Sequence, residues 1–137
     1  MRIGLFALMG LLVTASAGPA ATCSCAFLPA EQIMERAAVF TGFAMATSPA
    51  KPGYSITTFR VTESFKGART GSTIRILHRS GLSASCGVRF EGGKSHTLFA
   101  QSVDGALSAS LCTTWGFRGE SGPALIAKLR ALRGADK

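Results

Sequence analysis

The residues of this sequence best suited to chemistry are its four cysteines, Cys23, Cys25, Cys86 and Cys112. Two of them stand one residue apart in the stretch AATCSCAFLP, shortly after an apolar N-terminal segment. An even number of cysteines in a small exported domain predicts disulfide bonds. A bond between Cys23 and Cys25 would close a very small, strained ring, so each of them is expected to pair with one of the two distant cysteines. Two connectivities meet this condition, and the residues by themselves do not choose between them.

A zinc site is the rival use of these thiols, with His78 and His96 as further ligands. Structural zinc sites usually carry their ligands in closely spaced pairs such as C-x2-C or H-x3-H, and this sequence has neither. An oxidising compartment also favours disulfides over thiolates. We therefore expect two disulfides, and no metal or other cofactor held by the protein itself.

An enzymatic function has the least support. Both histidines lie in strand patterns, where a position in a barrel is a more frequent role than that of a catalytic base. No cysteine is expected to be free, and the sequence has no G-x-S-x-G motif, paired carboxylates or phosphate-binding loop. We expect a protein that is not an enzyme.

Residues 1–22 have the features of a secretory signal peptide followed by a short segment. Arg2 supplies the positive charge, IGLFALMGLLV is an apolar core, and the small residues of ASA suit a signal peptidase that cleaves after Ala17. The apolar run is short for a membrane-spanning helix. Retention as a membrane anchor and lipid attachment to the first cysteine are the less favoured alternatives.

The first residue of the mature chain bears directly on function. Cleavage at the best site would leave Gly18 first, whereas cleavage before Cys23 would require Thr22 at the −1 position, where it is unfavourable. We expect a secreted protein, periplasmic or extracellular, without a transmembrane anchor. Residues 23–137 have the length of a single domain.

The charge is strongly positive, because 15 Lys and Arg residues against 7 Asp and Glu give a formal net charge of +8. A charge of this sign favours an anionic polymer, an envelope surface or an acidic protein as partner, although scattered basic residues also suit a solvated surface. Nucleic acid is not expected, since aromatic residues are not interleaved with Lys and Arg as base stacking requires. We expect a monomer.

The middle of the chain reads mainly as strands. Strand patterns are expected at residues 38–47, 53–67, 72–79, 95–101 and 106–112, after a short helix within 28–37. Asp104 and Gly105 form a hairpin turn between the last two. In residues 53–67 the apolar phase slips between Ile56 and Phe59, which predicts a bulge or a crossing between two faces of a barrel.

Residues 121–134 predict a closing amphipathic helix. Ser121 or Gly122 caps it, and Gly134 ends it. Its apolar stripe is Leu125, Ile126, Leu129 and Leu132, and its water-facing residues are Lys128, Arg130 and Arg133. We expect the stripe to close a barrel and not to bind a membrane surface. The fold class predicted is mainly β, a five-stranded OB-fold-like barrel with a short N-terminal helix and a C-terminal amphipathic helix; a two-sheet sandwich is the alternative.

Several short motifs together resemble a known family. They are CSC at 23–25, VFTG, SFKG, SASCG and a cysteine after ALSASL. In this combination the chain resembles the N-terminal inhibitory domain of the tissue inhibitors of metalloproteinases, a branch of the netrin-like modules with an OB-fold. The resemblance extends from Cys23 to about Trp115. The family's third N-domain disulfide, long basic hairpin loop and Cys-rich C-terminal domain have no counterpart, which places the chain with short relatives, bacterial ones among them.

The resemblance implies both a disulfide pattern and a mechanism. It implies the pairs Cys23–Cys86 and Cys25–Cys112, and a secreted inhibitor in which the Cys23 amine and carbonyl chelate the catalytic zinc of a target protease. Ser24 would point toward the specificity pocket, and Ser85 and Cys86 would form the adjoining contact ridge. Cys23 would thus be a metal ligand only in the complex, and any residue before it would abolish the chelate.

Two other functions fit the same residues. A netrin-like binding module, non-enzymatic, would hold an acidic envelope or extracellular partner on the barrel surface. Alternatively, the disulfides of the Cys-x-Cys pair only stabilise the fold. A free Cys23 amine would favour the inhibitor, whereas a salt-dependent interaction unaffected by N-terminal extension would favour the binding module.

Trp115 and Phe117 are expected to cover an end of the barrel.

Overall fold

The computed structural model describes residues 23–26, 28–81, 86–114 and 122–135. The expected signal peptide, the Gly18 start, Ser85, the capping Ser121, Trp115 and Phe117 lie outside the described residues. In chain order the elements are α1 (Ala30–Ile33), β1 (Ala38–Lys51), β2 (Tyr54–Lys66), β3 (Thr73–Arg79), β4 (Ser95–Val103), β5 (Ala106–Ala109), the 3-10 helix η2 (Leu111–Thr113) and α2 (Gly122–Ala135). No helix among the described residues is both long and apolar enough to span a membrane.

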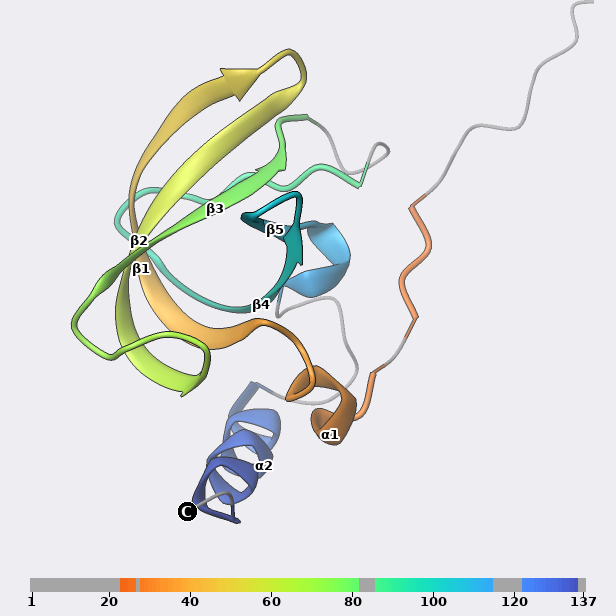
Figure 1. Cartoon of the computed structure of the whole chain (residues 1–137), viewed down its shortest axis with the longest axis vertical. Helices are drawn as coiled ribbons and strands as arrows, with labels where there is room; N and C mark the ends of the chain where they lie inside the picture. The colour runs from red at the N-terminus through yellow and green to blue at the C-terminus, as the bar shows by residue number, and fades with distance from the viewer. Residues whose placement is uncertain (1–22, 27, 82–85, 115–121, 136–137) are drawn as a thin grey trace, which may run out of the picture.

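The five strands close in a ring in the order β1-β2-β3-β5-β4, and β4 pairs again with β1 (Figure 1). All neighbours are antiparallel except β3 and β5, which run parallel over only two residue pairs, Leu77–Ser108 and His78–Ala109. A five-stranded ring with one short contact is the expected form of a partly open OB-fold-like barrel. The prediction of a mainly β, five-stranded OB-fold-like architecture flanked by two helices is confirmed.

The barrel interior is filled by aromatic and branched side chains from every strand. Phe59 of β2 lies at the centre, with its ring 5.8 Å from that of Phe40 and 4.9 Å from that of Phe90, both edge-to-face. Phe90 comes from the segment between β3 and β4, so a connection as well as the strands supplies the core. Packing of this kind is worth about 0.5–1.5 kcal/mol per aromatic pair beyond the burial of area.

The phase slip expected within β2 does not flip its buried face. Thr57, Phe59, Val61 and Phe65 are all buried and share one parity, whereas Ile56 lies half-buried on the outside. The register shifts expected from the slip do exist, and they lie in the pairing of β1 with β2. A threonine could take the inward position because its hydroxyl has a buried partner, described below.

β1 is longer than expected and only partly central. After Ala44 its residues are exposed, and Phe43 and Met45 present 44% and 49% of their surface to solvent. Beyond Ala44, β1 pairs with β2 alone among the described strands, whereas the facing half of β2 is still flanked by β3 as far as the Tyr54–Arg79 pair (Figure 1). Only the first half of β1, residues 38–43, is enclosed by two neighbouring strands, β2 and β4.

A second apolar cluster closes one end of the barrel. Leu125 and Leu129 of α2 pack with Ile33 of α1 and with Val39 and Phe65 of the sheet. The expected closing role of the α2 stripe is confirmed. Figure 1 shows α1 and α2 side by side below the ring of strands.

Ion pairs fix α2 on the sheet. Arg130 donates two hydrogen bonds of 2.8 Å to the carboxylate of Glu63 on β2, and these bonds are the largest cause that lowers the pKa of Glu63. Arg133 donates to the Ser64 carbonyl oxygen at 2.8 Å and lies over the Phe65 ring. Arg133 is thus half-buried instead of facing water as expected. The helix also continues through Gly134 to Ala135.

The glycine of the SFKG motif has a steric function. Gly67 ends β2 with φ +68°, and a Cβ there would overlap the carbonyl oxygen of Ala37. Only glycine tolerates both the left-handed conformation and this close approach. The motif therefore lets β2 turn away directly beside the start of β1.

One chain of polar groups crosses the barrel wall. The Thr57 hydroxyl lies 2.8 Å from Nε2 of the buried His78 and 2.7 Å from the Thr47 hydroxyl. Nδ1 of His78 lies 3.3 Å from the Arg79 carbonyl oxygen, so Nδ1 donates and Nε2 accepts from Thr57. Burial lowers the pKa of His78 from about 6.5, against the smaller effect of its backbone hydrogen bonds. The expectation that His78 is a barrel residue is confirmed.

The packing of α2 generates a first prediction. Leu129→Ala removes a fully buried side chain from the closing cluster and should lower the free energy of unfolding by about 2–5 kcal/mol. Leu132→Ala on the same helix, where the leucine is only half-buried, should cost markedly less. Urea unfolding of the two variants measures the difference, and equal losses would contradict the closing role of the stripe.

The burial of neutral His78 generates a second prediction. The unfolded chain binds a proton near pH 6.5 that the folded barrel resists, so stability should be complete above that pH and fall as the pH drops below it. The slope from one such group is at most about 1.4 kcal/mol per pH unit. Unfolding measured between pH 5 and 8 should lose this dependence in His78→Gln and retain it in His96→Gln. The same dependence in both variants would contradict the assignment.

Candidate functional site

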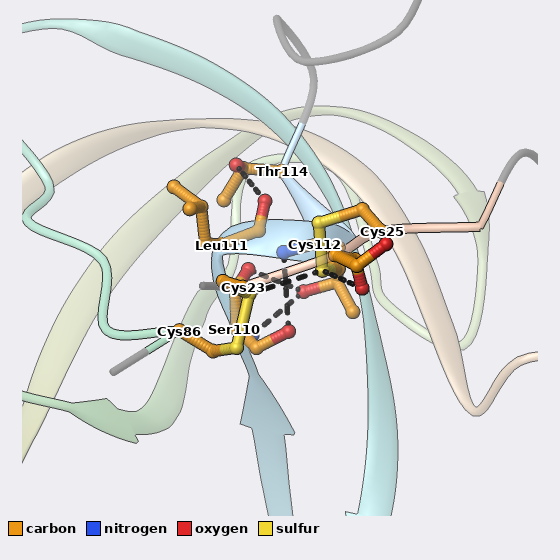
Figure 2. Close-up of a disulfide and its surroundings, with 9 residues drawn as sticks. Cys23, Cys25, Cys86, Ser110, Leu111, Cys112 and Thr114 are labelled. Atoms are coloured by element: carbon orange, nitrogen blue, oxygen red, sulfur yellow. Dashed lines mark hydrogen bonds between the residues drawn. A yellow bond between two sulfur atoms is a disulfide. The ribbon is translucent and has the colours of Figure 1, made fainter. Parts of the chain in front are cut away.

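The N-terminal described segment is fastened to the barrel at both of its cysteines. Cys23 is bonded to Cys86 and Cys25 to Cys112, with Cα–Cα distances of 5.2 Å in each pair (Figure 2). This is the connectivity that the family resemblance implied, and the predicted pairing is confirmed. Between the two anchors Ser24 is exposed, while both cysteines are half-buried.

The 3-10 helix η2 fixes one of the anchors. The Ser110 hydroxyl oxygen accepts a bond of 3.2 Å from the Cys112 amide, and the Thr113 hydroxyl oxygen accepts one of 2.8 Å from the Ser110 amide. Thr114 then donates its hydroxyl to the Leu111 carbonyl oxygen at 2.8 Å. These reciprocal bonds form a capping box, which holds the backbone of Cys112 in place. Sequence reasoning missed it, although the pattern Ser-x-x-Thr was visible.

Cys86, the other anchor, is joined to the same short helix. Its carbonyl oxygen accepts a hydrogen bond of 3.1 Å from the Leu111 amide. Its φ is +57°, in the left-handed region that few side chains adopt. Both disulfides therefore end on one continuous support, built from Cys86 and η2.

The two disulfides lie against each other. The Sγ atoms of Cys23 and Cys112, which belong to different bonds, are 3.7 Å apart, and Sγ of Cys112 lies 3.9 Å from the Ser24 carbonyl oxygen. Three of the sulfur atoms fall within 4.8 Å of one another, a spacing that thiolates could use for a metal. Here each of the four sulfurs is bonded to another sulfur, so none is a thiolate ligand or a nucleophile.

The surface around these disulfides offers main-chain atoms and hydroxyl groups. Residues 23–26 (CSCA) and 110–114 (SLCTT) contain no acidic or basic side chain. The only side chain exposed between the anchors is that of Ser24. Of the expected contact residues, the structure brings Cys23, Ser24, Cys25 and Cys86 together, and Ser85 lies outside the described residues. His78 and His96 lie elsewhere, against Phe90 in the barrel.

An apolar cavity of about 290 Å³ lies directly behind the fastened segment. It is bounded by the segment itself at Ala26 and Leu28, by Leu98 and Phe99 of β4, by Cys112, and by Leu129 of α2. Sequence reasoning did not anticipate it, because its walls come from segments far apart in the chain that only the fold brings together.

The anchoring generates a third prediction. The bonds join residues 63 and 87 positions apart, so replacing either pair by serines should lower the free energy of unfolding by roughly 2–4 kcal/mol. Urea unfolding of Cys23→Ser/Cys86→Ser and of Cys25→Ser/Cys112→Ser measures this. A pair whose removal leaves stability unchanged would not be a structural anchor.

The chain was also compared with known proteins. Neither a protein-family model nor a curated protein matches it.

Proposed function

We propose that this protein is a secreted inhibitor of a zinc metalloprotease that binds through its Cys23 end. The observation that supports the proposal best is the exposed Ser24 held between two anchored cysteines. An extended segment fixed at both sides has the form of a wedge that can enter an active-site cleft. The resemblance of CSC and SCG to the inhibitory family points to the same end of the molecule.

The chemistry uses main-chain atoms of Cys23. A free α-amino nitrogen and the carbonyl oxygen of the same residue form a five-membered chelate, which can fill the open coordination position of a catalytic zinc. The sulfur of Cys23 is occupied in its disulfide and is not a ligand. Ser24 then points toward the specificity pocket, its hydroxyl lies near the catalytic carboxylate of the protease and displaces the attacking water, and Ser85 and Cys86 form the adjoining ridge.

Rigidity of the wedge favours tight binding. Association costs free energy for every side chain and loop that must be ordered, and a segment fixed beforehand avoids most of that cost. Both disulfides of this site end on the support formed by Cys86 and the capped η2 helix. The described contact residues, Cys23, Ser24, Cys25 and Cys86, thus share one preorganised base.

The chelate requires that the mature chain begin at Cys23. Disulfides form in oxidising compartments, so the two bonds are compatible with export to the periplasm or the medium. Removal of residues 1–22 either needs peptidase cleavage after Thr22 or a second trimming step after cleavage at Ala17. A chain that keeps Gly18 has an acylated Cys23 nitrogen and no chelate.

A second candidate function is a binding module for an acidic partner. It is favoured by four exposed cations on the outer barrel face, Lys51, Arg60, Arg75 and Arg79. Among the described residues, none of them forms an ion pair with a carboxylate. This function needs neither a free Cys23 amine nor a protease.

The inhibitor proposal gives a fourth prediction. Disulfide-bonded protein that starts at Cys23, released from a removable fusion, should inhibit a metzincin catalytic domain or thermolysin. One added alanine before Cys23 should weaken inhibition at least about 100-fold, because the loss of a few kcal/mol of zinc ligation corresponds to that factor. The inhibition constants of the two forms measure the effect, and equal inhibition would rule out the chelate.

The pH dependence supplies an independent control. Only the neutral amine binds zinc, and its pKa in model peptides is about 7.7–8.0, so inhibition by the Cys23 form should weaken as the pH falls from 8 to 6. As a reference, the activity of the protease alone and its inhibition by an unrelated inhibitor that has no amine are measured over the same pH range. A flat profile relative to that reference would contradict amine ligation.

A further inference from the structure

Four cations gather on the outer face of β1, β2 and β3, where no function has been assigned. Phe59, Ile76 and His78 are buried in the barrel, so the residues next to them, Arg60, Arg75 and Arg79, project outward and are exposed. Lys51, at the end of β1, is exposed beside them. We call Lys51, Arg60, Arg75 and Arg79 the basic face.

The cations form two groups. Thr58 lies opposite Arg75 and Arg60 opposite Thr73, so Arg60 and Arg75 are diagonal neighbours about 7–8 Å apart. At the other end Tyr54 lies opposite both Lys51 and Arg79. Arg79 lies four positions after Arg75, which puts the groups roughly 13 Å apart along the strand.

Tyr54 organises the second group. The ammonium nitrogen of Lys51 lies 4.5 Å and the guanidinium carbon of Arg79 lies 5.6 Å from the centre of its ring. Contacts between a cation and an aromatic face are worth about 0.5–1 kcal/mol at exposed sites. Two positive charges are therefore held together at the hairpin end without an acidic residue between them.

Acidic residues are nearly absent from this surface. Glu63 is the only acidic residue in β1, β2 and β3, and it is bonded to Arg130 and Arg133 of α2. Asp104, in the turn before β5, is an exposed acidic residue outside these three strands, and among the described residues no ion pair joins it to any of the four cations. In the part of the chain that the structure describes, none of the four cations forms an ion pair with a carboxylate. The charge of the face is thus open to an anionic partner.

The surface between the two groups suits a sugar chain. Ile56 and Leu77 form a half-buried apolar pair at its centre, opposite Ser48 and Ser108 on the two flanking strands. Hydroxyl side chains can exchange hydrogen bonds with sugar hydroxyls, and the apolar pair can contact the carbon-bound faces of sugar rings. A single small anion cannot reach both groups, whereas a polymer with repeated charges can.

Nucleic acid fits this surface less well. The outward aromatic rings of β1 and β2 are those of Phe43, opposite Arg60, and Tyr54, at the far end. Six residues of β2 separate these positions, about 20 Å, so successive bases have no adjacent rings on which to stack. Cations already lie over the Tyr54 ring.

We infer that the basic face binds an anionic polysaccharide, whose charged groups engage the Arg60–Arg75 group and the Lys51–Arg79 group in turn. This inference rests on the second candidate function, whose partner and surface it names. It does not depend on the Cys23 chelate, which uses a different part of the molecule.

The test measures binding of the exported, disulfide-bonded protein to dextran sulfate and to polygalacturonate by calorimetry, with neutral dextran as the blank. Arg75→Gln/Arg79→Gln should weaken binding by about tenfold or more and reduce its salt dependence. The matched control, Arg69→Gln/Lys94→Gln, removes the same charge from exposed positions elsewhere and should stay within about twofold. Binding to either charged polymer, with this difference between variants, supports the inference.

Other results would overturn it. These are binding to neither charged polymer, equal weakening by both variants, or tighter binding of a dT30 oligonucleotide through the same arginines. If Arg75→Gln/Arg79→Gln lowers the unfolding temperature, Lys51→Gln/Arg60→Gln tests the same face at its other positions. An alanine added before Cys23 should leave polysaccharide binding unchanged, so failure of the inhibitor proposal and failure of this inference are distinguishable.

Discussion

Two adjacent disulfides are the constraint on which the candidate site depends. Residues 23–26 form no strand or helix, and Ala26 lines the apolar cavity beside them. Their position follows from covalent bonds to Cys86 and Cys112, and those residues are in turn held by hydrogen bonds around η2.

The barrel below this site is held by two separate apolar clusters. One fills the ring of strands around Phe59, and the other lies under it, between the sheet and the two helices. This division explains why a sheet whose ring closes by only two parallel residue pairs can be stable. Leu129 and the ion pairs of Glu63 tie the chain's last helix to β2, far from the disulfides in sequence.

The proposed functions use chemically different surfaces. The disulfide end carries no ionisable side chain in residues 23–26 and 110–114, so recognition by these residues depends on shape, main-chain atoms and hydroxyl groups. The basic face lies on the outside of β1, β2 and β3 and has positive charge without acidic partners among the described residues. Because a strand alternates between core and solvent, the sequence that builds the core of β2 and β3 also sets the spacing of these cations.

The sequence by itself determined the strands, the closing helix and the involvement of all four cysteines. These elements have local patterns in the sequence. The alternation of apolar residues in the strands and the stripe of Leu125 and Leu129 indicate which face of each element is buried. The Asp104–Gly105 pair indicates a turn between two strands. The choice between two disulfide connectivities, in contrast, depends on which cysteines the fold brings within bonding distance. Geometry along the chain left both open, and the motif resemblance supplied the pairing.

Only the tertiary structure decided the features that need contacts between distant segments. Thr57 is buried because His78 of the next strand offers it a hydrogen bond, a partner that no pattern within β2 reveals. The second half of β1 is exposed because its pairing with β4 stops at Phe43, which leaves β2 as its one neighbouring strand among the described residues. The cavity behind Cys112 and the pairing of Tyr54 with cations from two strands likewise come from chain closure, since each joins residues whose separation in sequence carries no periodic signal.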